Sequence, residues 1–350
     1  MKRVLVCALD WGLGHAARCI PVIKALQLHG AEVFLASSGS AGELLKQEFP
    51  RLSYHNLPGY QPRYHRRGSL AGALAFQVPH FLHTIRMEHE ETEALVGSLR
   101  LDAIISDNRY GCYSDKVKSV ILTHQSHVHL PGLWGFFDPY VNLRLHTYIK
   151  RYHQVWVPDQ PGSGLSELFM DDRTPFAYVG WLSRFPIRQE EALPSQLMVI
   201  LSGPEPQRMI LEQLLRPQLI SFPGTVTLVT GQPSELTRVK IGNLEVFNHL
   251  PTDEMERRIR GAEWVIARSG YSTIMDLIAL GKKAVFIPTP GQPEQIALAD
   301  FLMRNRIAFC CDQRNFVLGK ALAEAGSYTG LGGLSQMSGL LDKEIINLLA

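Results

Sequence analysis

Short apolar runs alternate with longer segments of helical periodicity along most of the chain. In the first half, this pattern predicts a helix at residues 16–28 that ends at His29-Gly30. The apolar runs of the same half predict buried strands at residues 4–9, 32–37, 101–106, 120–123, 154–157 and 177–180. A strand, a helix and a second strand in succession form a βαβ unit, which is typical of a doubly wound parallel sheet.

The second half shows the same alternation with no internal sequence repeat. Helices are predicted to begin at Gln207, at Tyr271 and after Thr252, which would cap its helix. Further helices are expected at residues 321–325 and 342–349, with a loop at 330–333. Strands are predicted at residues 197–201, 226–230, 244–247, 264–267 and 284–287. Both halves therefore favour an α/β fold.

A chain of 350 residues is longer than one hydrophobic core normally supports, so we expect two domains. We predict an N-terminal domain at residues 1–182, a linker within 183–194, a C-terminal domain at 195–333 and a terminal helical segment at 334–350. The chain is 45% hydrophobic and 19% charged, and its net charge is +2. This balance is ordinary for a globular protein and argues against nucleic-acid binding.

The five cysteines have neither a CxxC motif nor a metal-ligand spacing, which favours buried thiols in a reducing compartment. No apolar run approaches the ~18 residues of a membrane span. The apolar run after Met1 is too short for a signal peptide. We therefore expect a cytoplasmic protein.

A glycine-containing turn follows the first predicted strand. Gly12, Gly14 and Ala17 match the dinucleotide fingerprint Gly-x-Gly-x-x-(Gly/Ala), which is one interpretation of this turn. That fingerprint requires an acidic residue at the end of the second strand, where this chain has Ser37 and Ser38. A nicotinamide dinucleotide site is therefore disfavoured.

The same turn places His15 at the start of the first helix, above the carboxyl ends of the strands, where α/β folds bind ligands. A neutral imidazole, with a pKa near ~6.5, can accept the proton of a hydroxyl nucleophile. Alternatively, His15 caps the helix or donates to a phosphate. Asp107 follows the predicted strand at residues 101–106 and could orient His15, as the carboxylate of a triad does, or could cap the next turn.

A polar turn in the second half surrounds the start of another helix. It comprises Arg268-Ser269-Gly270 together with Ser272 and Thr273. The free N–H groups and the dipole of a helix start suit a phosphate or diphosphate. Asp276 could accept hydrogen bonds from ribose hydroxyls, and Glu294-Gln295 from a sugar ring. The combination indicates a nucleotide-sugar site, although each Ser or Thr alone is an ordinary helix cap and Asp276 alone an ordinary solvated residue.

These residues resemble the donor-binding region of GT-B glycosyltransferases of the family 28 type. The match consists of Arg268-Ser269-Gly270, Thr273, Asp276, Pro288 and Glu294-Gln295, with Asp276 in place of the Glu of the family. The resemblance is clear over about a third of the chain. It implies a GT-B fold, in which two Rossmann-like, doubly wound α/β domains face each other across the cleft that holds the active site.

The resemblance also implies roles for residues outside this region. His15 would be the general base, and Asp107 its partner. Pro204 and Pro206 stand in the expected phosphate loop and remove two N–H donors, which departs from the family. The last helix would return to the first domain. The further donor-binding residues that the resemblance implies are Gly14, Ser202, Gly203, His249 and Leu250.

Two features of the first half suggest an acceptor site. His124, His127 and His129 follow a predicted strand at alternating positions. Their spacing, without an accompanying carboxylate, is only weak evidence for a metal site. We expect instead that these histidines line the acceptor cleft. A basic loop at residues 58–67, an apolar helical segment at 76–85 and an aromatic cluster at 133–137 could contact a lipid surface. A mobile loop and a core-facing helix are the more ordinary interpretation of such segments.

The sequence therefore predicts a glycosyltransferase that moves a sugar from a nucleotide diphosphate donor, most simply a UDP-sugar, to a hydroxyl acceptor. The acceptor is unidentified, and a lipid-linked molecule, reached by peripheral contact at the inner face of a membrane, is one candidate. The chain has no Asp-x-Asp motif, so we expect a metal-independent reaction in which the nucleotide sugar is a substrate and no cofactor is used. A nucleotide-sugar epimerase of the same fold and a non-catalytic sugar-nucleotide sensor are the alternatives.

Overall fold

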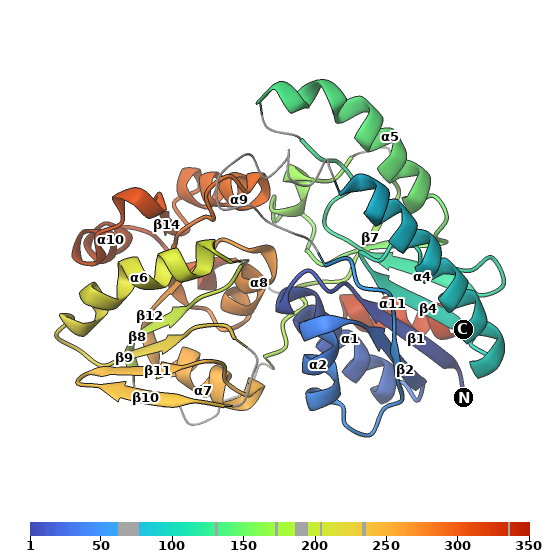
Figure 1. The fold of residues 1–350 in the computed structure, drawn as a ribbon, viewed down its shortest axis with the longest axis horizontal. Coiled ribbons are helices and arrows are strands. Elements are labelled where there is room, and N and C mark those ends of the chain that lie inside the picture. Colours follow the sequence, from blue (N-terminus) through green and yellow to red (C-terminus); the bar gives the residue numbers. More distant parts are fainter. Residues whose placement is uncertain are drawn as a thin grey trace. The chain divides into compact units, whose positions relative to one another are not determined.

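The computed structural model describes residues 1–61, 77–129, 132–171, 174–185, 195–203, 205–232, 236–334 and 337–350. The chain divides into two compact units (Figure 1). The first comprises Met1–Arg184 and Gln336–Ala350, and the second comprises Phe185–Ser335. Most of the predicted linker lies outside the described residues.

The first unit is built on a seven-stranded sheet in the order β3-β2-β1-β4-β5-β6-β7, with every neighbouring pair parallel. Its order reverses between β1 and β4, which is the point where doubly wound sheets bind ligands at their carboxyl edge. The strands are β1 (Arg3–Ala8), β2 (Glu32–Ser37), β3 (Tyr54–Asn56), β4 (Ala103–Asp107), β5 (Lys118–Leu122), β6 (Gln154–Val157) and β7 (Ala177–Tyr178).

Helix α1 begins at Leu13, three residues before the predicted start. Gly12 adopts a φ of 97°, which favours glycine and lets the chain turn from β1 directly into the helix. His15 therefore lies within the first turn of α1 rather than before it. The helices of this unit are α1 (Leu13–Leu28), α2 (Gly39–Glu48), α4 (Val78–Leu99), α5 (Asp138–Ile149) and α11 (Leu340–Leu349), with short 3₁₀ turns η1 (Gly132–Phe137) and η2 (Ser166–Leu168).

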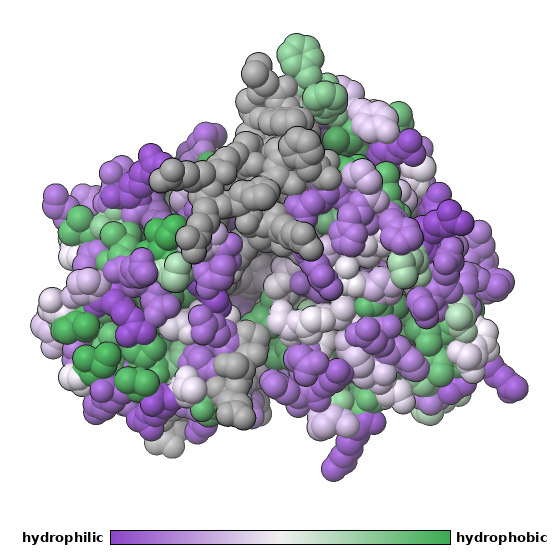
Figure 2. Space-filling model, in the orientation of Figure 1, coloured by the Kyte–Doolittle hydropathy of each residue, from purple (hydrophilic) through white to green (hydrophobic). Residues whose placement is uncertain are grey.

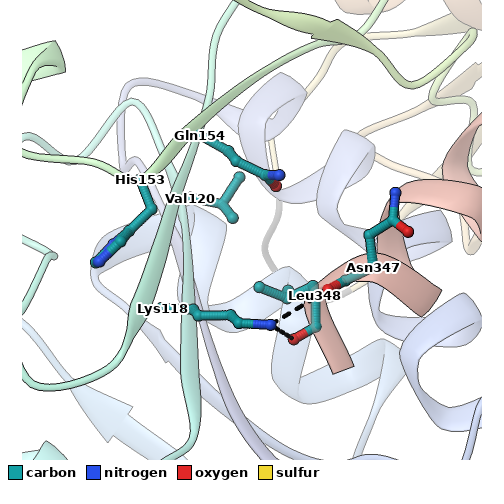
Figure 3. A pocket seen from close by; sticks show the side chains of 6 residues that line it. All are labelled: Lys118, Val120, His153, Gln154, Asn347 and Leu348. Atoms are coloured by element: carbon teal, nitrogen blue, oxygen red, sulfur yellow. Dashed lines mark hydrogen bonds between the residues drawn. The ribbon is translucent and has the colours of Figure 1, made fainter. Parts of the chain in front are cut away.

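The C-terminal helix α11 packs against α1 and β7 within the first unit. Its buried face carries Ile345 and Leu348, and Asp342 lies 2.9 Å from Nε2 of His29 at the end of α1. The Lys118 ammonium donates to the carbonyl oxygens of Asn347 and Leu348, each at 3.3 Å (Figure 3).

A cavity of about 200 Å³ lies beside this contact, lined by Lys118, Gln154 and Leu348 among others (Figure 3). Lys118 and Gln154 are the first residues of β5 and β6. The cavity is therefore at the amino edge of the sheet, opposite the carboxyl edge where a ligand is expected, and Lys118 already caps the end of α11. This cavity belongs to a packing seam and not to the candidate site.

The second unit has its own seven-stranded sheet in the order β10-β11-β9-β8-β12-β13-β14. All pairs are parallel except β10 with β11, an antiparallel edge hairpin that the sequence pattern did not predict because all four residues of β10 are exposed. The strands are β8 (Ser195–Ile200), β9 (Val226–Val229), β10 (Arg238–Ile241), β11 (Leu244–Phe247), β12 (Ala262–Ala267), β13 (Lys283–Phe286) and β14 (Phe309–Cys310).

The core of this unit fills the space between the sheet and the helices α6 and α10. Leu211 and Leu215 of α6 pack with Ile266 and Val285 of the sheet and with Ala321 of α10. The helices are α6 (Gln207–Ile220), α7 (Thr252–Gly261), α8 (Tyr271–Ala279), α9 (Pro293–Arg304) and α10 (Leu318–Ala325), with 3₁₀ turns η3 (Gln313–Asn315) and η4 (Leu331–Gly333).

Two local predictions for the second unit were wrong. Thr252 is the first residue of α7, the flanking position is Pro251, and no side chain caps the helix there. Residues 331–333 form the 3₁₀ turn η4 rather than an irregular loop. Among the described residues, no helix combines the length and apolar character needed to cross a bilayer.

Candidate functional site

The carboxyl edge of the first sheet gathers the polar residues that follow β1, β4 and β5. These three strands are direct neighbours, so the residues at their ends must lie close together. β1 leads through the turn at Gly12 into α1, which carries His15; β4 ends at Asp107; and His124 comes shortly after β5. The local order of strand, turn and helix thus sets the position of each side chain.

The two predicted catalytic residues are in contact. Nδ1 of His15 lies 3.0 Å from Oδ1 of Asp107. Asp107 is completely buried, whereas the His15 side chain is 17% exposed, so one edge of the imidazole is accessible. The arrangement can hold the ring and leave it open to a ligand. Whether His15 accepts a proton stays a prediction.

Arg18 completes this cluster, although the sequence pattern did not predict a role for it. Its Nε donates to Oδ2 of Asp107 at 2.6 Å, and its Nη2 donates to Oδ1 of the same carboxylate. Nη1 lies 3.1 Å from Nδ1 of His124. An Arg three residues after His15 faces the same way only if both belong to one helix. The spacing of His15 and Arg18 could therefore have indicated their contact, but the predicted helix began at residue 16 and did not include His15.

Opposing influences set the charge of this cluster. Burial alone would raise the pKa of Asp107, but the Arg18 guanidinium and His15, which both contact the carboxylate, lower that pKa below its usual range. Burial also lowers the pKa of His15; Asp107 opposes this fall and Arg18 adds to it. His15 is thus neutral at neutral pH, which is the form that can act as a base.

A second buried network lies beside this cluster, around Arg109. Its guanidinium donates to Oε1 of Glu88 at 2.6 Å, to the Ser38 hydroxyl at 2.6 Å and to the Ala8 carbonyl at 2.7 Å. Tyr60 donates its hydroxyl to the other carboxylate oxygen of Glu88 at 2.8 Å. The network connects the ends of β1 and β2 with Pro58 and Tyr60 of the following chain.

The three alternating histidines have different surroundings. His124 is buried against Arg18, whereas His127 and His129 stack edge to face on each other, with ring centroids 4.4 Å apart. Burial lowers the pKa of His127, and His129 adds to this effect. Within the part of the chain that the structure describes, no group of three or more His, Cys, Asp or Glu side chains could hold a metal ion.

The predicted acceptor surfaces are described only in part. The basic positions Arg63 and Arg67 and the apolar Phe76 lie outside the described residues. Of the apolar positions that follow them, Phe81 packs edge-on against Trp11, and Leu82 is exposed.

In the second unit, the predicted donor residues meet at the start of α8. A Cβ atom built on Gly270 would lie 3.9 Å from both Nε2 of Gln295 and Oγ1 of Thr273. Gly270 precedes the first residue of α8, and the half-buried Ser272 and Thr273 lie in its first turn. Backbone N–H groups, a hydroxyl and an amide are therefore close to an unfilled side-chain position. This is an arrangement that can accept an anion.

Arg268 and Ser269 do not contribute their side chains to this position, contrary to the prediction for Arg268. The Arg268 guanidinium is buried and donates to Gln313 Oε1 at 2.7 Å and to the backbone carbonyls of Gln207 and Ile287, each at 3.0 Å. The Ser269 hydroxyl donates to the carbonyl of Gln295 at 2.7 Å. Both side chains tie neighbouring segments together through these hydrogen bonds, while Nε of Arg268 is buried without a hydrogen-bond partner among the described residues.

The remaining donor candidates lie within α8 and α9 and on the loops that follow β8 and β11. Asp276 is buried, and Gln295 accepts a hydrogen bond from the backbone N–H of Thr289 at 2.8 Å. Gly203 adopts a φ of 94°, and Oγ1 of Thr289 would lie 3.6 Å from a Cβ built there. Ser202, His249 and Glu294 are half-buried, Leu250 is buried, and Pro204 lies outside the described residues.

Comparisons with known proteins agree with this architecture. Residues 210–327 match the glycosyltransferase family 28 C-terminal domain. A segment of 70 residues is 36% identical to UDP-N-acetylglucosamine--N-acetylmuramyl-(pentapeptide) pyrophosphoryl-undecaprenol N-acetylglucosamine transferase of Rickettsia rickettsii (strain Sheila Smith). This segment spans only 19% of this chain and 19% of that protein. The match therefore does not show that this chain has the activity of the Rickettsia enzyme.

Solved structures resemble the whole chain. The glycosyltransferase SnogD from Streptomyces nogalater has a TM-score of 0.63 at 15% identity, covering 99% of this chain and 94% of that one. MurG from Acinetobacter baumannii has a TM-score of 0.59 at 14% identity, covering 100% and 99%. At these identities the likeness establishes the fold, which is GT-B: two Rossmann-like α/β units.

Proposed function

We propose that this GT-B glycosyltransferase, whose second unit contains a family 28 C-terminal domain, transfers a sugar from a nucleotide diphosphate to a hydroxyl acceptor. The observation that carries the proposal is the meeting of Gly270, Thr273 and Gln295 at the start of α8, inside the matched domain. The comparisons name transferases, and so favour transfer over an epimerase or a silent sensor.

The second unit would bind the donor. The amide N–H groups at the start of α8 and the helix dipole would meet the diphosphate, and Gly270 leaves room for it. A UDP-sugar is the proposed donor, supported by the matched Rickettsia enzyme, whose name includes UDP-N-acetylglucosamine. The nucleotide sugar is a substrate in this scheme, and no resident cofactor takes part.

The first unit would supply the base. With Nδ1 of His15 directed at Asp107, Nε2 is the nitrogen left to accept the acceptor's hydroxyl proton. The hydroxyl oxygen then forms its bond to the anomeric carbon as the bond from that carbon to the diphosphate oxygen breaks. The nucleoside diphosphate leaves with the electron pair of that bond, and the start of α8 would stabilise its charge.

A lipid-linked acceptor is the finer part of the proposal. Phe136, Phe137, Tyr140 and Leu143 form an exposed apolar face on η1 and α5, and hydrophobic side chains are visible over this part of the first unit in Figure 2. Such a face suits an apolar carrier at a membrane surface. Replacing Phe136 and Leu143 with Ser should reduce co-sedimentation with phospholipid vesicles. Leu28→Ser, at an equally exposed position on α1, should not.

The variant His15→Ala tests the main proposal. We expect it to abolish sugar transfer and to keep UDP binding, since the residues proposed to meet the diphosphate at the start of α8 belong to the other unit. UDP at one hundred times its dissociation constant should raise the stability of both proteins by ~2.7 kcal/mol. His29→Ala, at the opposite end of α1, is the control and should keep both properties. Full transfer activity in His15→Ala, or no stabilisation of the wild type by any nucleoside diphosphate, would refute the proposal.

A further inference from the structure

Arg18 contacts three other polar side chains at the carboxyl edge of the first sheet. Its side chain is 1% exposed, and it lies against Asp107, His15 and His124. Because a guanidinium is always protonated and can only donate, it fixes a positive charge in the middle of the cluster. None of the predicted roles of His15 and Asp107 uses this charge.

We propose that Arg18 is a positioning residue for His15, which cancels the charge of Asp107 so that the carboxylate orients the imidazole without making it more basic. The effect on catalysis rests on the proposed function, whereas the effect on the imidazole itself does not.

Asp107 contacts both Arg18 and His15 through its carboxylate. Arg18 reaches both carboxylate oxygens, with Nε on Oδ2 at 2.6 Å and Nη2 on Oδ1. His15 shares Oδ1, at 3.0 Å from its Nδ1. In an isolated His–Asp pair the negative carboxylate stabilises the imidazolium. Here a positive charge lies in contact with the same carboxylate, so an imidazolium would face both signs at similar distances.

The imidazole of His15 in turn contacts both Arg18 and Asp107. Nδ1 of His15 lies 2.9 Å from Nη2 of Arg18, as well as 3.0 Å from Asp107. A ring nitrogen has only one position in the ring plane, which holds either a hydrogen or a lone pair. With hydrogen on Nδ1, the ring donates to Asp107 and Nε2 remains a base. Adding a second proton would place an imidazolium against the guanidinium, so Arg18 opposes that step.

The other groups around His15 do not replace this effect. Nδ1 of His124 lies 3.1 Å from Nη1 of Arg18 and can accept its hydrogen bond. The buried Cys19 thiol lies 3.5 Å from Oδ2 of Asp107, and burial raises its pKa well above the usual value. Among the described groups facing this cluster, Asp107 supplies the negative charge and Arg18 the positive one. Burial is the largest cause of the lowered pKa of His15; Asp107 opposes it, and Arg18 adds to it, which is the direction the proposal requires of Arg18.

A titration of His15 by NMR of its ring nitrogens tests the proposal without any substrate. Arg18→Gln should raise the pKa of His15 by about 1 unit or more, because Asp107 is then uncompensated. Asp107→Asn should lower it. The double variant Arg18→Gln/Asp107→Asn is decisive, because it leaves no unpaired buried charge and is therefore expected to fold. If the two charges cancel, its His15 pKa stays close to that of the wild type.

The outcome that overturns the proposal is equally definite. If Asp107 acts on His15 without compensation, the pKa in the double variant falls by about 1 unit or more. An unchanged pKa in Arg18→Gln would also show that Arg18 is only structural. Once a transferase assay is available, the acidic limb of kcat/KM in Arg18→Gln should move to higher pH by the same amount, while UDP binding is unchanged. Failure of that assay alone counts against the proposed function and not against the titration.

Discussion

The Glu88 carboxylate and the Arg109 guanidinium form an ion pair with no exposure to solvent, with 2.6 Å between Oε1 and Nη1. Arg109 stands two residues after Asp107, and the Asn108 between them has a φ of 52°. This turn sends Asp107 toward His15 and Arg109 toward α4, so one loop anchors both buried networks. Disturbing Glu88 should therefore affect the stability of the unit that carries His15.

Glu88→Gln should change how stability depends on pH. Burial raises the pKa of Glu88 from 4.5 to about 7, although Arg109 opposes the rise. The native state therefore binds a proton more tightly than the unfolded state, and the wild type loses stability as the pH rises from about 4.5 to 7. The loss from this group is about 3 kcal/mol, and the non-titrating variant should not show it.

Chemical denaturation at several pH values measures this difference. Glu90→Gln, at an exposed position of the same helix, is the control and should follow the wild type. A parallel pH dependence in wild type and Glu88→Gln would show that the carboxylate does not titrate in this window.

Gly270→Ala should separate folding from donor binding. Gly270 has φ −79° and ψ 142°, which any residue adopts, and an added methyl group meets only ordinary contacts at 3.9 Å. We therefore expect a change in stability of less than about 1 kcal/mol. The methyl group would occupy the space proposed for the diphosphate, so stabilisation by UDP should be lost.

Gly319→Ala is the matched control for this variant, since a Cβ there has no neighbour within 4 Å and the position belongs to the same unit. It should keep the response to UDP. Normal UDP binding by Gly270→Ala would place the diphosphate elsewhere.

Arg268→Met should destabilise the second unit. The guanidinium connects the segment after β13 and the start of α6 to η3, and its loss removes these buried hydrogen bonds to backbone carbonyls and to Gln313. We expect a cost of about 3 kcal/mol or more, measured by denaturation without ligand. Arg304→Met, at the exposed end of α9, should cost less than about 0.5 kcal/mol. A stable Arg268→Met protein with weakened UDP binding would instead restore the direct contact predicted from the sequence.

The case of Arg268 shows what a sequence pattern can supply. The apolar run at residues 264–267 predicts a buried strand, and the polar residues after it predict a turn at the carboxyl edge, because both properties follow from local periodicity. Which of those polar side chains turns outward depends on carbonyls of segments distant in the chain, such as Gln207 and Ile287. No local pattern contains that information.

The site in the first unit has the same limit. His15 and Asp107 could be paired from the sequence because adjacent parallel strands end at one edge. Arg18 was missed for a smaller reason: the helix boundary was wrong by three residues, and the positive φ of Gly12 that sets it is a backbone property. The strand β10 was not predicted because the exposed residues of this edge strand show no alternation of apolar and polar positions.

The C-terminal helix α11 should contribute strongly to the stability of the first unit. Ile345 is completely buried, whereas the adjacent Ile346 is 53% exposed, so the two positions differ in burial and not in chemistry. Ile345→Ala should cost about 2–5 kcal/mol, because it removes buried methyl groups and leaves a cavity. Ile346→Ala should cost less than about 0.5 kcal/mol. Denaturation of the two variants side by side measures the contrast, and equal losses would mean that α11 does not pack through this face.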